Sequence, residues 1–511
     1  MNRIKITSII FSLFFFGLQT VAQAERANLK EQFLNNDSII YTINIRSFGA
    51  VDNNKDGLID LSKGDIRGTF LNAKEKLPML KEEGINTVYL LPITKTGKLK
   101  ALGTAGSLYA LDSFSELNEQ LDDITTSKTI KQQAKEFVDY AHSLDLNVIV
   151  DLPSCGSYDL SLNKPSWFIK NEDNESVIPA DWTDVRLFKI YNTKGTLYEP
   201  MVKNFKDFID MVQDIGFDGI RADVAAIKPY EFWKEIIDYA TSKNKNFIFI
   251  AEANTEWSNP ASDWVYHYST VKELLKAGFI GYYGSWSDFN SVKSKKVFDL
   301  KIEKNLKILK QNKNSALLGA FATHDQQAPI LKGKNYWSTV LWLNTTLPLN
   351  SYFLDGFSTG DDFIYPYENK KAHVTYTDDE YYFVHNGMFD IFNLSASSNH
   401  KHPEYKKEYI KAIKFKKDYS NVIKPYNYKT INTHSDNIFA YKLSDSRYTI
   451  LVIGSLNDKK RNSIKVRLKE IQPATVTMIN SKIIPNIKKG SIKTSLQPME
   501  IQVYLIKKSI Q

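Results

Sequence analysis

The chain has a single cysteine, Cys155, among 511 residues, which excludes any disulfide within the chain. A small disulfide-held scaffold is therefore ruled out, although we expect an oxidising compartment. Stability must come from an apolar core or from bound metal. After residue 21, no apolar run is long enough to span a membrane. Solenoid-type repeats and low-complexity tracts are also lacking.

The composition also lacks the features of a nucleic-acid-binding protein. There are 66 Lys and Arg against 58 Asp and Glu, a formal net charge of +8, but no arginine-rich block and no basic stripe interleaved with aromatic residues. We interpret the lysines as a solvated surface spread over the whole chain. Hydrophobic residues make up 42% and aromatic residues 13%, which is enough for a large core in a globular protein.

The N-terminus is typical of a secretory signal. A charged start, Met1 to Lys5, precedes an apolar run from Ile6 to Val21 and the small-residue site Ala22-Gln23-Ala24. We therefore predict a signal peptide over residues 1–24, a secreted or periplasmic location, and no stable membrane insertion after cleavage. An uncleaved membrane anchor is the alternative, although the run is somewhat short for a span.

Between residues 38 and 420, strand-like apolar runs alternate with amphipathic helical stretches. Eight strands are predicted, at 38–45, 86–92, 147–151, 218–223, 247–252, 278–283, 316–322 and 349–354. Helical patterns include 70–83, 130–144, 201–215, 232–241 and 298–311, with a last helix over 405–417. Eight strand–helix units predict a (β/α)8 TIM barrel, in which function collects in the loops after the strand C-termini.

Two other regions depart from this alternation. Residues 152–195 are too long for an ordinary connection and are rich in aromatic side chains, so we predict an inserted subdomain after strand three. From residue 421 the pattern changes to short alternating strands at 438–443, 448–453, 463–466 and 501–505, which predicts a C-terminal antiparallel β domain. The expected division is therefore barrel over 25–151 and 196–420, insert over 152–195 and β domain over 421–511.

Three of the predicted strands lead to an acid. Asp223 stands two residues after Arg221, so on an extended chain the two side chains share a face and the arginine can keep the carboxylate ionised. Glu252 ends the next strand, and Asp325 follows a later one. Glycoside hydrolysis needs such a pair, one carboxylate to attack or to steer water and one acid of raised pKa. A structural ion pair is the alternative for Asp223 and Arg221, and Glu256 is a rival of Glu252.

Three segments carry a family resemblance. Ile220-Arg221-Ala222-Asp223, Ala251-Glu252-Ala253 and Phe321-Ala322-Thr323-His324-Asp325 resemble, in order and spacing, motifs of the α-amylase superfamily, glycoside hydrolase family 13. Val148 to Asp151 resembles the start of the family's first motif. The resemblance covers nearly the whole chain after the signal, since the barrel, the insert after strand three and the C-terminal β domain all match.

The resemblance implies a role for each site residue. Asp223 would be the nucleophile, Glu252 the general acid and then base, and Asp325 the residue that grips the sugar at the cleavage point. The surrounding binding site would be formed by Arg221, His324, Asp151 and Tyr109. Among these, Arg221 would keep Asp223 charged, His324 would bond the same sugar, and Tyr109 would supply an aromatic platform, while Asp151 is expected to support the site through hydrogen bonds.

The sequence also departs from the family pattern. Cys155-Gly156 stands where Asn-His usually ends the first motif, so a usual calcium ligand and a usual sugar-binding imidazole are missing. Ala226-Ile227 replaces a frequent Lys-His. The implied activity is retaining hydrolysis of α-glucosidic bonds in starch-like or malto-oligosaccharide substrates, without an organic cofactor. A transglycosylase and a catalytically degenerate glycan-binding protein remain alternatives, and the oligomeric state stays open.

One loop has the spacing of a calcium site. Residues 52–60 place oxygen side chains at nearly every second position around a glycine, which suits a hard cation. An EF-hand would need an acid at the twelfth position, where Lys63 stands. The loop resembles a calcium loop after the first barrel strand in several family members, which implies as ligands the side chains of Asp52, Asn54, Asp56 and Asp60 and the carbonyl of Leu58. A polar Asx-rich turn is the alternative.

Overall fold

The computed structural model describes residues 26–51, 53, 61–101, 107–179, 182–256, 269–284, 286, 289–325, 328–360, 402–481 and 485–508. The predicted signal peptide over 1–24 and all five predicted calcium ligands lie outside these residues.

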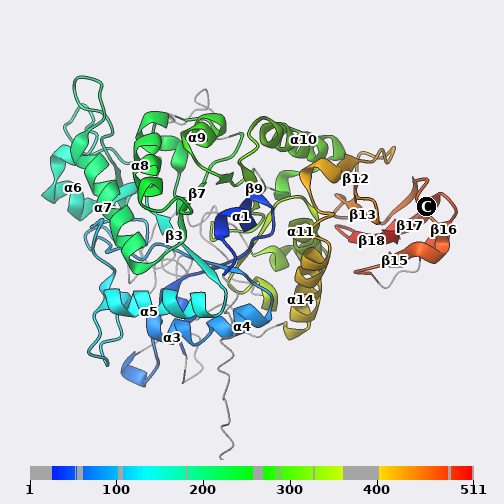
Figure 1. Cartoon of the computed structure of the whole chain (residues 1–511), viewed down its shortest axis with the longest axis horizontal. Coiled ribbons are helices and arrows are strands. Elements are labelled where there is room, and N and C mark those ends of the chain that lie inside the picture. The colour runs from blue at the N-terminus through cyan, green and yellow to red at the C-terminus, as the bar shows by residue number, and fades with distance from the viewer. Residues whose placement is uncertain are drawn as a thin grey trace, which may run out of the picture.

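The eight predicted strands form a closed parallel barrel (Figure 1). Their order is β1-β10-β9-β8-β7-β6-β3-β2. Their bounds are β1 Ile39–Ile43, β2 Thr87–Leu90, β3 Asn147–Leu152, β6 Gly219–Ala222, β7 Ile248–Ala251, β8 Gly281–Tyr282, β9 Ala316–Gly319 and β10 Asn350–Leu354. Nearly every strand residue is buried, as expected for parallel strands covered on both faces. The prediction of a TIM barrel is confirmed.

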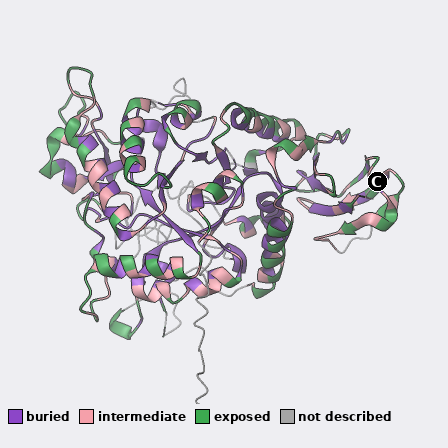
Figure 2. Ribbon diagram, viewed as in Figure 1, coloured by how far each residue is buried: buried purple, intermediate pink, exposed green. Residues whose placement is uncertain are grey.

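The helices surround the barrel, and their buried residues face it (Figure 2). Their bounds are α2 Ile45–Phe48, α3 Phe70–Lys74, α4 Leu77–Glu82, α5 Ile130–Ser143, α7 Glu199–Ile215, α8 Tyr230–Lys243, α9 Val271–Ala277, α10 Lys295–Gln311, α11 Lys334–Thr346 and α14 Pro403–Asp418. The predicted helix over 70–83 is two helices. The second has Pro78 in its first turn, where a missing N–H costs nothing.

Helix α7 precedes β6, the strand that carries Arg221, and its sequence determines where the helix ends. Its apolar positions lie on one buried face, and it ends at Gly216, which has φ 110°. A glycine adopts this left-handed conformation without a steric cost, so it ends the helix cleanly. The chain then turns directly into β6, which carries Arg221 and leads to Asp223.

A short N-terminal helix, α1 (Leu29–Leu34), closes the barrel from its N-terminal end. Phe33 is fully buried and packs with barrel-interior residues such as Ile248 and Leu318. Its ring lies against Gly281, where any Cβ would meet it at 2.4 Å. Arg26, just before this helix, forms an ion pair of 2.6 Å with Asp218.

Residues between β3 and α7 form a small unit of their own. It contains β4 (Cys155–Ser157) paired antiparallel with β5 (Val185–Leu187), and helix α6 (Tyr158–Asn163). Phe168 is buried and Trp167 is partly buried against the core. These two aromatic side chains therefore act as local core.

The C-terminal region contains two antiparallel sheets, ordered β11-β12-β13-β18-β15 and β14-β17-β16. Their bounds are β11 Tyr428–Thr430, β12 Ile438–Ser444, β13 Tyr448–Ser455, β14 Asn462–Arg467, β15 Val476–Met478, β16 Asn486–Lys488, β17 Ser491–Leu496 and β18 Ile501–Lys507. The prediction of an antiparallel domain is confirmed, with four more strands than expected. Among the described residues, no helix is both long and apolar enough to cross a bilayer.

Candidate active site

Arg221 is the centre of a buried polar cluster at the C-terminal ends of neighbouring strands. Its guanidinium bonds Asp151 at 2.8 Å and Asp223 at 3.1 Å through Nη1, and Glu252 at 2.8 Å through Nη2. Its Nε donates to Tyr283 Oη at 3.0 Å. Arg221 is only 1% exposed. One cation therefore holds three carboxylates from β3, β6 and β7.

This sharing changes the electrostatics of Asp223. Burial raises its pKa well above the usual range; Arg221 lowers it, while Glu252 and Asp151 raise it further. Arg221 thus favours the ionised form of Asp223, but it divides its charge among three carboxylates, so burial and the neighbouring acids outweigh it. The cluster carries more acid than base and favours an extra proton.

Glu252 is held by the backbone as well as by Arg221. Its Oε2 accepts a hydrogen bond of 2.7 Å from the N–H of Val224. Val224 follows Asp223 directly and has φ 37° and ψ 52°, a left-handed conformation that is rare and strained for a β-branched residue. This bend aims a main-chain donor from the Asp223 segment at Glu252, so the two acids are fixed relative to each other.

Asp151 lies beneath these acids and is fully buried. Its Oδ2 accepts hydrogen bonds from Tyr89 Oη at 2.5 Å and Tyr109 Oη at 2.7 Å. With Arg221 on the same carboxylate, Asp151 has no open face toward solvent. Its carboxylate is thus occupied by contacts within the cluster and does not reach the surface.

Tyr109, His324 and Asp325 form the other wall. The Tyr109 ring stacks on His324 with centroids 5.5 Å apart and an interplanar angle of 8°, and Tyr109 Oη lies 2.7 Å from His324 Nε2. Burial lowers the pKa of His324 to about 4, so this ring is neutral at pH 7. Asp325 Oδ1 lies 3.5 Å from His324 Nε2.

Among the charged residues of the cluster, the three predicted catalytic acids are the ones that reach solvent. The side chains of Asp223, Glu252 and Asp325 are 12%, 13% and 30% exposed, whereas those of Asp151 and Arg221 are 0% and 1% exposed. The sequence-predicted residues are thus brought together in two layers, with accessible acids above and buried supports below.

Sequence reasoning missed a second support behind Asp223. Lys228 is 1% exposed, and its ammonium donates to the carbonyl of Ser154 at 2.9 Å. The N–H of Ser154 donates to Asp223 Oδ2 at 3.3 Å, and its hydroxyl donates to the Asp223 carbonyl. Burial lowers the pKa of Lys228 to about 8. The only sequence signal for this contact was the position of Lys228, five residues after Asp223.

Cys155 lies in the apolar cluster behind this support. It is buried, and burial raises the pKa of its thiol to about 12. A thiol of that pKa is almost entirely protonated at neutral pH and is a poor nucleophile. Cys155 is therefore not a candidate catalytic group.

Asp325 gives the site a measurable pH signature. Burial raises its pKa to about 6, whereas a free aspartate titrates near ~3.9. Between these values the folded state keeps a proton that the unfolded state has released, so the stability contributed by this group falls as pH rises. We expect Asp325→Asn to flatten the dependence of the melting temperature on pH between about 4 and 6.

The control for this measurement is Asp214→Asn, because Asp214 is a solvent-exposed acid whose pKa is lowered by Lys131. It should leave the wild-type profile nearly unchanged in the same interval. The effect of Asp325→Asn should be modest because nearly a third of the side chain is exposed. A wild-type profile in the Asp325 variant would contradict the burial of this group.

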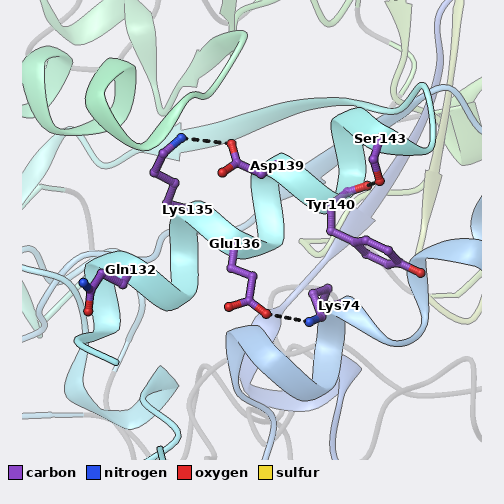
Figure 3. Close-up of a pocket in the computed structure, with 7 residues that line it drawn as sticks. All are labelled: Lys74, Gln132, Lys135, Glu136, Asp139, Tyr140 and Ser143. Atoms are coloured by element: carbon purple, nitrogen blue, oxygen red, sulfur yellow. Dashed lines mark hydrogen bonds and ion pairs between the residues drawn. The ribbon is translucent and has the colours of Figure 1, made fainter. Parts of the chain in front are cut away.

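A groove between α3 and α5 is separate from this cluster (Figure 3). Its charged side chains already pair, Lys74 with Glu136 at 2.8 Å and Lys135 with Asp139 at 2.9 Å. It lies on outer helices, and none of the residues that line it belongs to the polar cluster around Arg221. We therefore place the candidate active site at the barrel end and not in this groove.

No family model matches the chain. In sequence it is 28% identical over 228 residues to an α-1,4-glucan:maltose-1-phosphate maltosyltransferase of Bifidobacterium animalis, a match that covers 42% of this chain and 29% of the relative. In structure it matches an α-amylase from Lactobacillus plantarum with a TM-score of 0.65, 16% identity, and coverage of 93% of this chain and 99% of the other. The chain is therefore similar in sequence to α-glucan-acting enzymes over part of its length, and it shares the fold of α-amylases.

Within the α-amylase superfamily, the curated relatives differ in the reaction that their names state. An α-amylase of Haloarcula japonica is 22% identical over 227 residues, covering 42% of this chain and 29% of its own length, whereas the Bifidobacterium relative is a maltosyltransferase. The chain spans less than a third of the length of both. The similarity to these relatives therefore leaves hydrolysis and transfer open.

Proposed function

We propose that this protein is a retaining enzyme that cleaves α-glucosidic bonds of starch-like or malto-oligosaccharide substrates. The observation that carries the proposal is the placement of Asp223 and Glu252 on the two terminal nitrogens of one guanidinium, both open to solvent. Carboxyls held side by side in this way suit a retaining enzyme, in which they lie roughly 5 Å apart, and leave little room for the water of an inverting one.

In the first step, Asp223 attacks the anomeric carbon and Glu252 donates a proton to the leaving oxygen, so the glycosidic bond breaks as the glycosyl-enzyme bond forms. Burial raises the pKa of Asp223, which favours a proton shared within the cluster. Glu252 must hold that proton and Asp223 must be ionised for attack. Arg221 contacts Asp223 Oδ1 and Glu252 Oε2, so it can stabilise the negative charge on either acid.

In the second step, Glu252 removes a proton from the acceptor, whose oxygen attacks the anomeric carbon and releases Asp223. Water as acceptor gives hydrolysis, and a sugar hydroxyl gives transfer. Asp325 is proposed to bind the sugar at the cleavage point because 30% of its side chain is exposed, and the neutral ring of His324, which lies 3.5 Å from it and is 3% exposed, is proposed to contact the same sugar. Transfer is the second candidate, because several curated relatives are maltosyltransferases.

Incubation with maltoheptaose separates the possible reactions. We expect shorter maltosaccharides, the products of hydrolysis. Products longer than maltoheptaose would show that the enzyme transfers glycosyl units to a sugar acceptor and would overturn the hydrolysis proposal. Measurable binding without any change in chain length would overturn the enzyme proposal and favour a glycan-binding protein.

We also propose that the loop over residues 52–60 binds one calcium ion through Asp52, Asn54, Asp56, Asp60 and the carbonyl of Leu58. The described residues at its base hold the loop ends together, since Val51 pairs with Ile66 and Asn53 N donates to Asp65 Oδ1 at 2.8 Å. Elsewhere in the described chain, no group of three or more His, Cys, Asp or Glu side chains could hold a metal.

Calcium titration should therefore release heat and raise the melting temperature of the purified protein, because an ion that binds only the folded state stabilises it. Asp56→Ala should remove both effects, and the exposed Asp458→Ala on the C-terminal domain should keep them. Absence of heat and of a melting shift in the wild-type protein would leave the polar turn as the explanation.

We also propose that residues 1–24 are removed and that the protein is exported to the periplasm or the medium. The basis is the N-terminal pattern of a charged start, an apolar run and a small-residue site. Mass spectrometry of the protein recovered from the periplasmic fraction or the medium should give a mature chain that begins at Glu25. Recovery of the full-length chain in the membrane fraction would favour the uncleaved anchor.

A further inference from the structure

The net positive charge of the chain is concentrated at its C-terminal end. Residues 421–511 contain 16 Lys and Arg and 5 Asp and Glu, so this region carries +11, and the other 420 residues carry −3 of the total of +8. The lysines themselves are spread over the whole chain, whereas their excess over acidic residues is confined to this region. A charge asymmetry of this size suggests an anionic partner for the C-terminal region.

One sheet face gathers much of this charge. In the sheet β14-β17-β16, Lys465 stands opposite Lys493, and Arg467 and Lys488 flank Ser491. All four cationic side chains are exposed. Alternate residues of the same strands, among them Ile464, Val466, Ile492 and Leu496, are buried on the opposite face. We call the four residues Lys465, Arg467, Lys488 and Lys493 the cationic face.

The cationic face has no acidic counterpart. None of its four residues forms an ion pair with any described residue, and the remaining side chains in its paired rows are Ser463, Asn486, Ser491 and Ser495. Like charges directly opposite each other destabilise a sheet, so the pairing of Lys465 with Lys493 costs folding free energy. Because this pairing does not stabilise the fold, we explain it by the binding of an anion from outside the protein.

Protection of sheet edges explains only part of this pattern. Lysines on edge strands prevent edge-to-edge aggregation, which accounts for Lys465, Arg467 and Lys488 on the outer strands β14 and β16. Lys493 lies on the central strand β17, where no edge needs protection. Its charge adds to that of its neighbours across the strands and makes the face continuous.

We propose that the cationic face binds the headgroups of an anionic lipid membrane. Its strands place cations about 4.8 Å apart across a sheet surface, which suits many small anions in one plane. The face has no aromatic side chain for stacking on bases, which argues against single-stranded nucleic acid. Figure 1 shows β16 and β17 at the opposite end of the molecule from α6, so docking there leaves the inserted unit free.

Vesicle sedimentation of the full-length protein tests this proposal. We expect binding to vesicles of phosphatidylcholine with phosphatidylglycerol, none to phosphatidylcholine alone, and weaker binding as salt is added. Each Lys or Arg at such a surface contributes about 1 kcal/mol. The quadruple variant Lys465→Gln, Arg467→Gln, Lys488→Gln and Lys493→Gln should therefore lose roughly a hundredfold or more in partition coefficient.

The matched control removes the same charge elsewhere. It is the quadruple variant Lys296→Gln, Lys307→Gln, Lys310→Gln and Lys313→Gln, whose lysines are exposed on or just after α10. This control should bind vesicles within about threefold of wild type, allowing for screened long-range attraction. An equal loss in both variants would show an effect of net charge alone and would overturn the assignment to this face.

Other outcomes also overturn the proposal: no binding of the wild-type protein to anionic vesicles at low salt, full binding by the face variant, or binding to duplex DNA without binding to vesicles. The melting temperature of the face variant should match or exceed wild type, because repulsion between Lys465 and Lys493 is relieved. If it melts lower, Lys493→Glu, whose carboxylate faces Lys465, should still weaken vesicle binding while folding remains intact.

Discussion

Asp223→Asn is expected to reduce turnover of maltoheptaose by at least about 10³-fold, since loss of a covalent nucleophile usually has an effect of this order or larger. The amide is nearly isosteric with the carboxylate but is a far poorer nucleophile. Asp223 is the accessible acid that bonds Arg221 Nη1 and the Ser154 N–H. Reducing-sugar assays on the purified variant provide the measurement, and its circular dichroism should remain that of the wild type.

The matched control is Asp355→Asn. Asp355 also follows a barrel strand and is buried, but its carboxylate accepts from Tyr41 Oη at 2.8 Å and makes no contact with Arg221. This variant should keep turnover within about tenfold of wild type, since a lost buried hydrogen bond costs about 1–3 kcal/mol of stability and not the reaction itself. Undiminished turnover by Asp223→Asn would refute its role as nucleophile.

Arg221→Met is expected to destabilise the protein by about 3–5 kcal/mol, the usual cost of breaking a buried ion pair from one side. The substitution leaves Asp151, Asp223 and Glu252 without their shared cation. These acids must then bind protons or repel one another, so the loss of stability should grow as pH rises. Urea unfolding at pH 5 and pH 8 measures both effects, and turnover should be lost at both values.

A double-mutant cycle identifies the source of this loss. Asp151→Asn removes the carboxylate that is most completely buried beside Arg221. In combination with Arg221→Met it should recover part of the stability, with a coupling energy of at least about 1 kcal/mol. Strictly additive losses would show that Arg221 acts mainly through packing and not through its charge.

The barrel could be predicted from the sequence because each strand is a short apolar run and at least one helical stretch lies between it and the next. A strand buried on both faces needs no polar alternation, and the runs that end near Asp223 and Glu252 fall within two residues of β6 and β7. The convergence of the acids followed from the same logic, since parallel strands place their C-termini at one end of the barrel.

The rest could not be predicted because it depends on contacts between distant residues. Tyr89 and Tyr283 look like ordinary core aromatics in their strands, yet their hydroxyls bond Asp151 and Arg221. The contact between Lys228 and the Ser154 carbonyl cannot be predicted from the spacing of these residues in the sequence. The short strands β15 and β16 are three residues long, which is too short for an alternation to be recognised.

The helix that closes the barrel floor limits how this protein can be shortened. Phe33 fills the space beside Gly281, and the Asn350 side chain donates to the Phe33 carbonyl at 2.9 Å, so helix α1 is part of the interior packing. Recombinant versions should therefore start no later than Arg26, whose tether to Asp218 anchors the segment. An affinity tag is better placed at the C-terminus, where it does not interfere with the packing of helix α1 against the barrel.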